Sequence, residues 1–89
     1  DDTIRFDLPS NDEKIKLFAL RLKQFNGPAH AFETFLGATE KFSHADVENI
    51  CKTIIRKCIL SGKRNYSKKD IEFAVEKQKQ MVALRKSQY

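Results

Sequence analysis

The chain has 89 residues, 40% of them apolar and 33% charged, which suits one small domain with a compact core. With three Gly and two Pro, it does not look like an all-β fold with many tight turns. It contains no apolar run long enough for a membrane span, and we expect no signal peptide because the N-terminus is acidic. The net charge of +5 is compatible with nucleic acid, an anionic membrane, an acidic partner protein or solubility alone.

Residues 3–8 alternate between polar and apolar side chains, which is typical of a short β-strand. Pro9 ends the pattern, because proline cannot donate a hydrogen bond to a neighbouring strand. A lone strand beside helices has nothing to pair with in this chain. We therefore expect an orphan strand, and a chain that is one piece of a larger protein.

Helical spacing begins directly after this strand. Ser10 and Glu13 form a Ser-x-x-Glu capping box, and residues 26–28 (Asn-Gly-Pro) break the pattern. These signals predict a helix over about 11–24. Its apolar stripe consists of Ile15, Leu17, Phe18, Leu20, Leu22 and Phe25.

Two further helices are predicted in the middle of the chain. The first is short and ends somewhere between residues 36 and 40; it carries Phe32, Phe35 and Leu36. The second is predicted over about 44–61, because Ser43 and Asp46 have N-cap spacing and Gly62 supplies a stop. Its apolar stripe consists of Val47, Ile50, Cys51, Ile54, Ile55, Cys58 and Ile59.

The last helix is predicted to begin near residue 68, since Ser67 and Asp70 repeat the N-cap spacing. Beyond Val82 the sequence is mostly polar, and we expect fraying there. The helices should share one core that includes Phe18, Leu22, Phe35, Ile50, Ile54 and Ala74.

Cys51 and Cys58 are the two cysteines of the chain. Seven helical residues span about 10.5 Å, beyond the roughly 7 Å between Cα atoms that a disulfide tolerates. We expect two buried, unpaired thiols, which fits a reducing compartment such as the cytoplasm. We expect no zinc site, because His30 and His44 are distant in sequence.

Three tracts carry ordered motifs. Residues 1–9 (Asp-Asp-Thr-Ile-Arg-Phe-Asp-Leu-Pro), 39–47 (Thr-Glu-Lys-Phe-Ser-His-Ala-Asp-Val) and 66–74 (Tyr-Ser-Lys-Lys-Asp-Ile-Glu-Phe-Ala) resemble, in order and spacing, the segments that lead into and build the helical lid of AAA ATPases. The middle tract is similar to that family's Thr-x-Gly-Phe-Ser-Gly-Ala-Asp pattern. Lys41 and His44 stand where that pattern has glycine.

The resemblance implies an all-α, four-helix AAA lid subdomain over 10–83. The strand and linker at 1–9 would end the large AAA subdomain, and 84–89 would be a frayed tail. The chain has no Gly-x-x-x-x-Gly-Lys-Ser/Thr phosphate loop. We therefore expect no catalytic residue, no metal ligand and no cofactor in this piece by itself. The parent protein would be an ATPase that binds ATP or ADP with Mg²⁺.

The resemblance also implies which residues lie near the nucleotide in the parent. His44 and Ala45 would face the adenine and ribose, because a small residue at a helix N-terminus admits a flat ring. Leu20 and Arg21 would form the other wall, where Arg21 could stack on the base. The alternative for Arg21 is a solvated side chain.

The function implied is a lid that covers the nucleotide and couples its state to motion between subunits of a protein-remodelling machine. Its partners would be its own large subdomain and neighbouring subunits, in a ring that is usually a homo-hexamer. No membrane partner is expected. The alternative is a small basic helical module that binds nucleic acid or protein, with a basic end formed by Lys52, Arg56, Lys57, Lys63, Arg64, Lys68 and Lys69.

Overall fold

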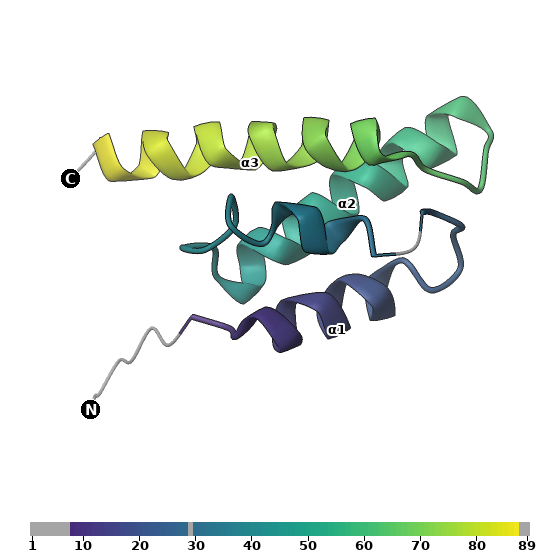
Figure 1. The fold of residues 1–89 in the computed structure, drawn as a ribbon. Helices are drawn as coiled ribbons and strands as arrows, with labels where there is room; N and C mark the ends of the chain where they lie inside the picture. The colour runs from purple at the N-terminus through teal and green to yellow at the C-terminus, as the bar shows by residue number, and fades with distance from the viewer. Residues whose placement is uncertain (1–7, 29, 88–89) are drawn as a thin grey trace.

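The structure, a computed structural model, describes the backbone of residues 8–28 and 30–87. The described part is helical, as predicted, and Figure 1 shows its arrangement. The elements in chain order are α1 (Asn11–Arg21), the 3₁₀ helix η1 (Phe32–Phe35), α2 (His44–Ser61) and α3 (Lys68–Ser87). The central helix α2 packs against both α1 and α3, and η1 contacts α1 and α3. α3 runs back along α2 in the opposite direction (Figure 1).

All three α-helices begin with the same local device. Ser10, Ser43 and Ser67 each accept a hydrogen bond through Oγ from the backbone N–H three residues on, and each has its own N–H bonded to the carboxylate of that residue. These reciprocal bonds satisfy donors that a helix end otherwise leaves free. The predicted starts at 11, 44 and 68 are therefore confirmed.

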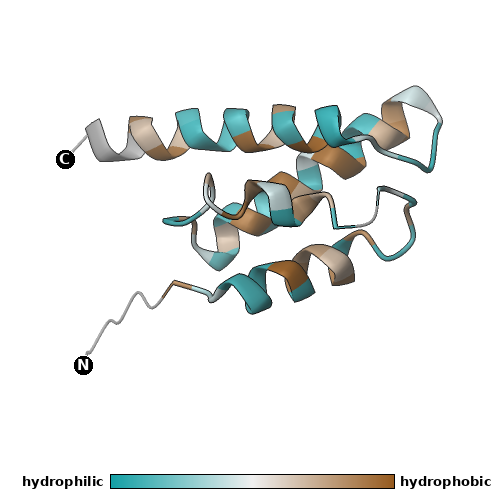
Figure 2. Ribbon diagram, viewed as in Figure 1, coloured by the Kyte–Doolittle hydropathy of each residue, from teal (hydrophilic) through white to brown (hydrophobic). Residues whose placement is uncertain are grey.

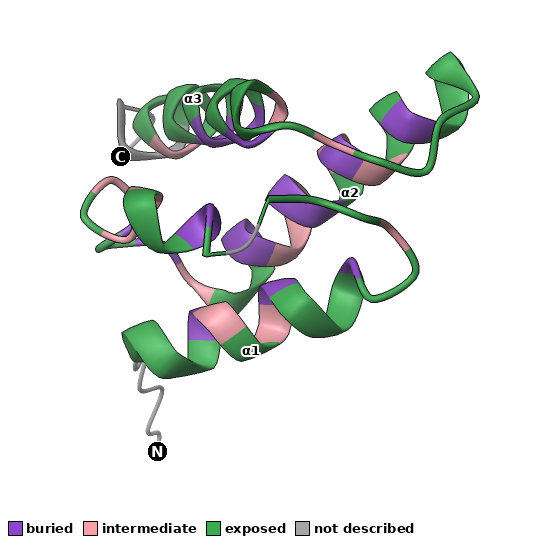
Figure 3. Cartoon of the chain, turned by 45° about the vertical axis from the view of Figure 1, so that its right-hand side comes forward, coloured by how far each residue is buried: buried purple, intermediate pink, exposed green. Residues whose placement is uncertain are grey.

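Figure 2 shows hydrophobic residues along α2 and on parts of α1 and α3. The buried residues lie on facing sides of the elements and the exposed residues on their outer sides (Figure 3). The buried hydrophobic core consists of Phe18, Leu22, Ala31, Phe32, Phe42, Val47, Ile50, Cys51, Ile54, Cys58, Ile71, Ala74 and Val75. The predicted core is confirmed, with Phe35 packed against it in a partly buried position. Cys51 and Cys58 are buried and unpaired, as expected.

The loop after α1 pairs with the loop before α3. The N–H of Asn26 donates to the Arg64 carbonyl at 2.7 Å, and the N–H of Tyr66 donates to the Asn26 carbonyl at 2.8 Å. Tyr66 then packs edge-on against Phe18, with ring centroids 6.1 Å apart. This pairing requires the chain to leave the helix early.

Several predicted boundaries are corrected by the structure. α1 ends at Arg21 rather than near 24, because the chain turns there to reach the Asn26 pairing. The second helical segment is a short 3₁₀ helix followed by turns. α3 continues beyond Val82 and ends at Ser87. The predicted strand falls mainly on residues 1–7, outside the described residues, and Leu8 and Pro9 belong to no strand.

Candidate functional site

The first turn of α2 is the part of the structure on which the predicted site depends. Ser43 caps the helix, and His44 and Ala45 follow it as exposed residues. Their N–H groups lie in the first turn, where the helix itself has no carbonyl that can accept them. This turn therefore presents a small side chain and free backbone donors to the surroundings.

Asp46 holds this turn against α3. It is buried, and its Oδ1 accepts a hydrogen bond of 2.8 Å from Nε2 of Gln78, while Oδ2 accepts one of 2.9 Å from the N–H of Ser43. One carboxylate thus closes the cap and links two helices. The direction in which His44 and Ala45 face is set by this buried pair.

Arg21 reaches the same end of α2 from the last turn of α1. Its guanidinium pairs with the Glu48 carboxylate at 2.6 Å. Glu48 lies one helical turn beyond Ala45, on the same side of the helix. The pair leaves the Arg21 side chain 51% exposed. Because a carboxylate binds the edge of the guanidinium, its flat faces stay available for stacking.

The four predicted site residues lie in two neighbouring places, and Arg21 borders both. The structure brings Arg21 to the first two turns of α2, where His44 and Ala45 lie, through Glu48. Leu20 instead lines a hollow farther along, with Phe25, Ile55 and Ile59. Arg21 lines this hollow together with Leu20, so the two residues predicted to form one wall share it, while only Arg21 also reaches Glu48.

Two residues that organise this region were not singled out from the sequence. Glu48 pairs with Arg21, and Gln78 binds Asp46. Gln78 follows Ile71, Ala74 and Val75 at helical spacing, and a polar residue on such an apolar face signals a buried hydrogen bond. Glu48 gave a weaker signal, its spacing of three and four residues from Ala45 and His44.

The pKa shifts of Glu13, Asp70 and Cys51 have structural causes. Backbone hydrogen bonding from Ser10 lowers the pKa of Glu13, and hydrogen bonding from Lys57, followed by that from Ser67, lowers the pKa of Asp70. Burial raises the pKa of the Cys51 thiol to about 12, so it is protonated and unreactive at neutral pH. Residues 8–28 and 30–87 hold no cluster of three His, Cys, Asp or Glu placed to bind a metal ion.

The predicted basic end is only partly available. Lys57 pairs with Asp70 at 2.7 Å and lies 5.3 Å from the centre of the Phe73 ring. Its charge is therefore engaged within the domain. Lys52, Arg56, Lys63 and Arg64 are exposed. None of the described helices is long and apolar enough to span a membrane.

Comparison with known proteins gives one informative relation. The chain is 32% identical over 79 residues to a protein of Methanocaldococcus jannaschii named as a 26S proteasome regulatory subunit homolog. The aligned part is 86% of this chain but 21% of that protein. No family model matches the chain, and no solved structure matches it. The match supports a distant relation between this chain and AAA-family proteins.

Proposed function

We propose that this chain is the helical lid of an AAA ATPase and covers one side of the nucleotide in its parent protein. The observation that carries the proposal is the exposed first turn of α2, at Ala45, with the Arg21–Glu48 pair one turn away. The ordered motifs and the distant relation over 86% of the chain support it. The 21% share of the relative fits a piece of a larger protein.

The residues present suit the base and ribose side of ATP or ADP. Ala45 leaves room for a flat ring, and Arg21 offers a guanidinium face on which such a ring can stack. His44 is exposed beside them. The magnesium ion and phosphates would be held by the parent's large subdomain, and phosphoryl transfer would be supplied there.

The lid would act by geometry. The described residues form one packed unit in which Asp46 and Gln78 link α2 to α3, and Arg21 and Glu48 link α1 to α2. A unit of this kind moves as a rigid body when the ligand at its edge changes. In the parent, it would pass the nucleotide state to a neighbouring subunit of a ring in the cytoplasm.

The substitution Ala45→Glu in the parent protein tests the nucleotide edge. A glutamate there adds bulk and a negative charge beside the ligand, and we expect binding of a fluorescent ATP analogue to weaken about tenfold, or about 1.4 kcal/mol. Glutamate in the first turn of a helix is otherwise favourable, so the fold should survive. Ala83→Glu, an exposed position on α3, is the matched control. Equal affinities for wild type and Ala45→Glu would remove Ala45 from the site.

The isolated 89-residue chain should show no ATP turnover. Phosphoryl transfer requires a phosphate cradle, a magnesium site and a group that orients water, and this piece supplies at most one wall for the base. Calorimetry with Mg·ATP and a phosphate-release assay are the measurements. Micromolar binding with steady turnover by the isolated chain would contradict the lid proposal.

The basic helical module remains the alternative, because Lys52, Arg56, Lys63 and Arg64 are exposed. It predicts tight DNA or RNA binding whose affinity falls steeply with salt. The lid proposal predicts weak binding without preference for sequence. Titration of a labelled oligonucleotide at two salt concentrations separates the two functions.

A further inference from the structure

The outer side of α1 and α2 carries an unusual concentration of exposed apolar surface. Leu20, Ile59 and Leu60 are the three most exposed large apolar side chains in the described part of the chain, at 63%, 67% and 81%. Exposed apolar side chains are common singly, but a contiguous group marks an interaction site.

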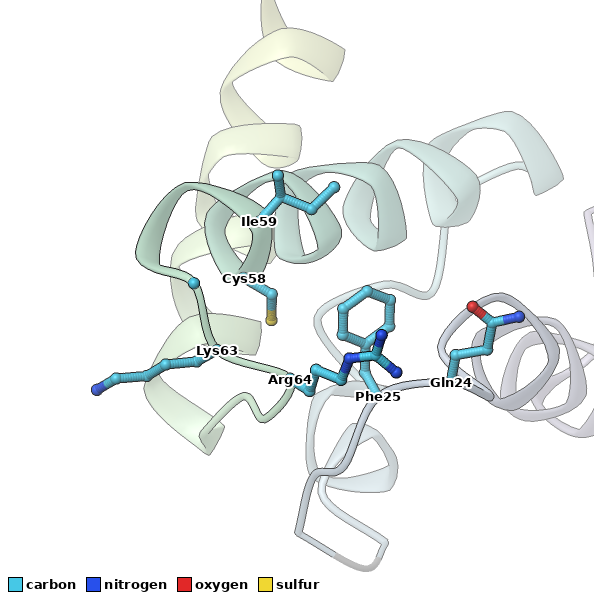
Figure 4. A pocket seen from close by; sticks show the side chains of 7 residues that line it. Gln24, Phe25, Cys58, Ile59, Lys63 and Arg64 are labelled. Atoms are coloured by element: carbon cyan, nitrogen blue, oxygen red, sulfur yellow. The ribbon is translucent and has the colours of Figure 1, made fainter.

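These side chains border hollows that join one another. Leu20, Phe25, Ile55 and Ile59 line one hollow, and Ile55, Ile59 and Leu60 line the next. We call this continuous surface of five side chains the outer groove. Phe25 and Ile59 also line a third hollow at its far end (Figure 4). Ile55 and Ile59 stand one turn apart and form a ridge along α2.

The rim of the outer groove is basic. Its cations come from α1, from α2 and from the loop after α2: Arg21, Lys23, Lys52, Arg56, Lys63 and Arg64. Glu48 is the one acid that lines these or the adjoining hollow, and it is paired with Arg21. An apolar floor with a basic rim complements a ligand that has an apolar stripe and acidic flanks.

We infer that the outer groove binds an acidic amphipathic helix of a partner protein. A helix fits because its apolar ridge can lie beside the Ile55–Ile59 ridge at the usual 8–10 Å spacing between helix axes. The residues the structure describes offer no strand edge to which an extended peptide could add, only an isolated bridge. This inference does not depend on His44 and Ala45, which lie at the other end of α2; Arg21 borders both sites.

Other occupants fit the surface less well. A second copy of the chain would bring its own basic rim against this one, and like charges repel. Nucleic acid would satisfy the rim but leave Leu60 and Ile59 against phosphates, where apolar side chains gain nothing. The acidic helix satisfies both the floor and the rim.

The probe is a synthetic amphipathic peptide of about 18 residues, or five helical turns, with leucines on one face and glutamates on the flanks. Its matched partner has lysines in place of the glutamates. Fluorescence anisotropy of the labelled peptides with the 89-residue chain should give saturable binding for the acidic peptide, at least tenfold tighter than for the basic one. Binding should weaken with salt, because the rim contributes electrostatically.

Variants place the binding on the groove. Ile59→Ser and Arg56→Glu should each weaken binding of the acidic peptide about tenfold. Both residues are exposed, so the fold should be retained, as circular dichroism would verify. Phe73→Ser and Lys77→Glu, also exposed but on α3, are the controls and should change nothing.

Five results would overturn the inference. The first is no binding of the acidic peptide, and the second is equal binding of both peptides. The third is concentration-dependent dimerisation that Ile59→Ser abolishes, which would assign the groove to a second copy. The fourth is loss of peptide binding in the full parent protein, which would mean that the parent itself covers the groove. Displacement of the acidic peptide by a DNA oligonucleotide would favour nucleic acid and would also count against it.

Discussion

Replacement of Asp46 should destabilise the fold more than the small size of its side chain suggests. All three helices start with a serine and a carboxylate three residues later, but the boxes at Ser10 and Ser67 are exposed at the surface. Asp46 is 3% exposed and also accepts the hydrogen bond from Gln78. The substitution Asp46→Ala therefore removes a cap and a link between helices, whereas Glu13→Ala removes a cap alone.

The magnitudes follow from these contacts. Loss of one side of a capping box costs about 1 kcal/mol. A buried hydrogen bond to a charged group adds about 1.5–3 kcal/mol, because the Gln78 amide is left without its partner. We expect Asp46→Ala to lower the free energy of unfolding by about 3 kcal/mol, and Glu13→Ala to lower it by clearly less. The larger loss is a substantial part of the roughly 4–13 kcal/mol typical of a chain this long.

Urea unfolding of the 89-residue chain, followed by circular dichroism at a helical wavelength, measures both losses. A double-mutant cycle with Gln78→Ala should give a coupling energy of about 1–2 kcal/mol between Asp46 and Gln78. Equal losses for Asp46→Ala and Glu13→Ala, with no coupling to Gln78, would refute the assignment of Asp46 as the link between α2 and α3.

Two further predictions concern the loops that pair at Asn26 and the loss of stability at acidic pH. A Cβ at Gly27 would lie 2.1 Å from the Tyr66 ring. Gly27→Ala should therefore destabilise the chain by about 1–3 kcal/mol, as measured by thermal unfolding. Gly37→Ala is the control, because nothing lies within 4 Å of a Cβ there, and it should be neutral or slightly stabilising. The folded pKa of Asp70 lies below its ordinary 3.8, so its stabilisation is complete above that value and is lost as the pH falls through the folded pKa. Asp70→Asn and Lys57→Met should each make the free energy of unfolding depend less on pH in the acidic range. An unchanged dependence on pH in either variant would contradict this.

Local sequence predicted the helix starts because their causes are local. A serine and a carboxylate three residues apart bind each other's backbone N–H groups wherever the chain is helical. Gly62 ended α2 for an equally local reason, since its φ of 70° is comfortable only for glycine. The apolar stripes also predicted the core, because helical spacing alone decides which side chains share a face.

Lys14 shows where sequence reasoning stops. A lysine in the first turn of a helix is ordinarily solvated, yet this one is 1% exposed and its ammonium donates to the Thr39 carbonyl at 2.6 Å. Burial lowers its pKa. The partner carbonyl lies 25 residues away in the chain, and no local sequence pattern predicts this contact.

The sequence by itself thus determined an all-α chain, its helix starts, its core faces and its resemblance to an ATPase lid, all of which depend on short spacings. Only the tertiary structure decided that α1 stops at Arg21, that Arg21 meets Glu48, and that Leu20 and Arg21 line one hollow with Ile55 and Ile59. Those outcomes depend on how whole helices pack, since contacts between distant residues are set by the combined fit of every buried side chain.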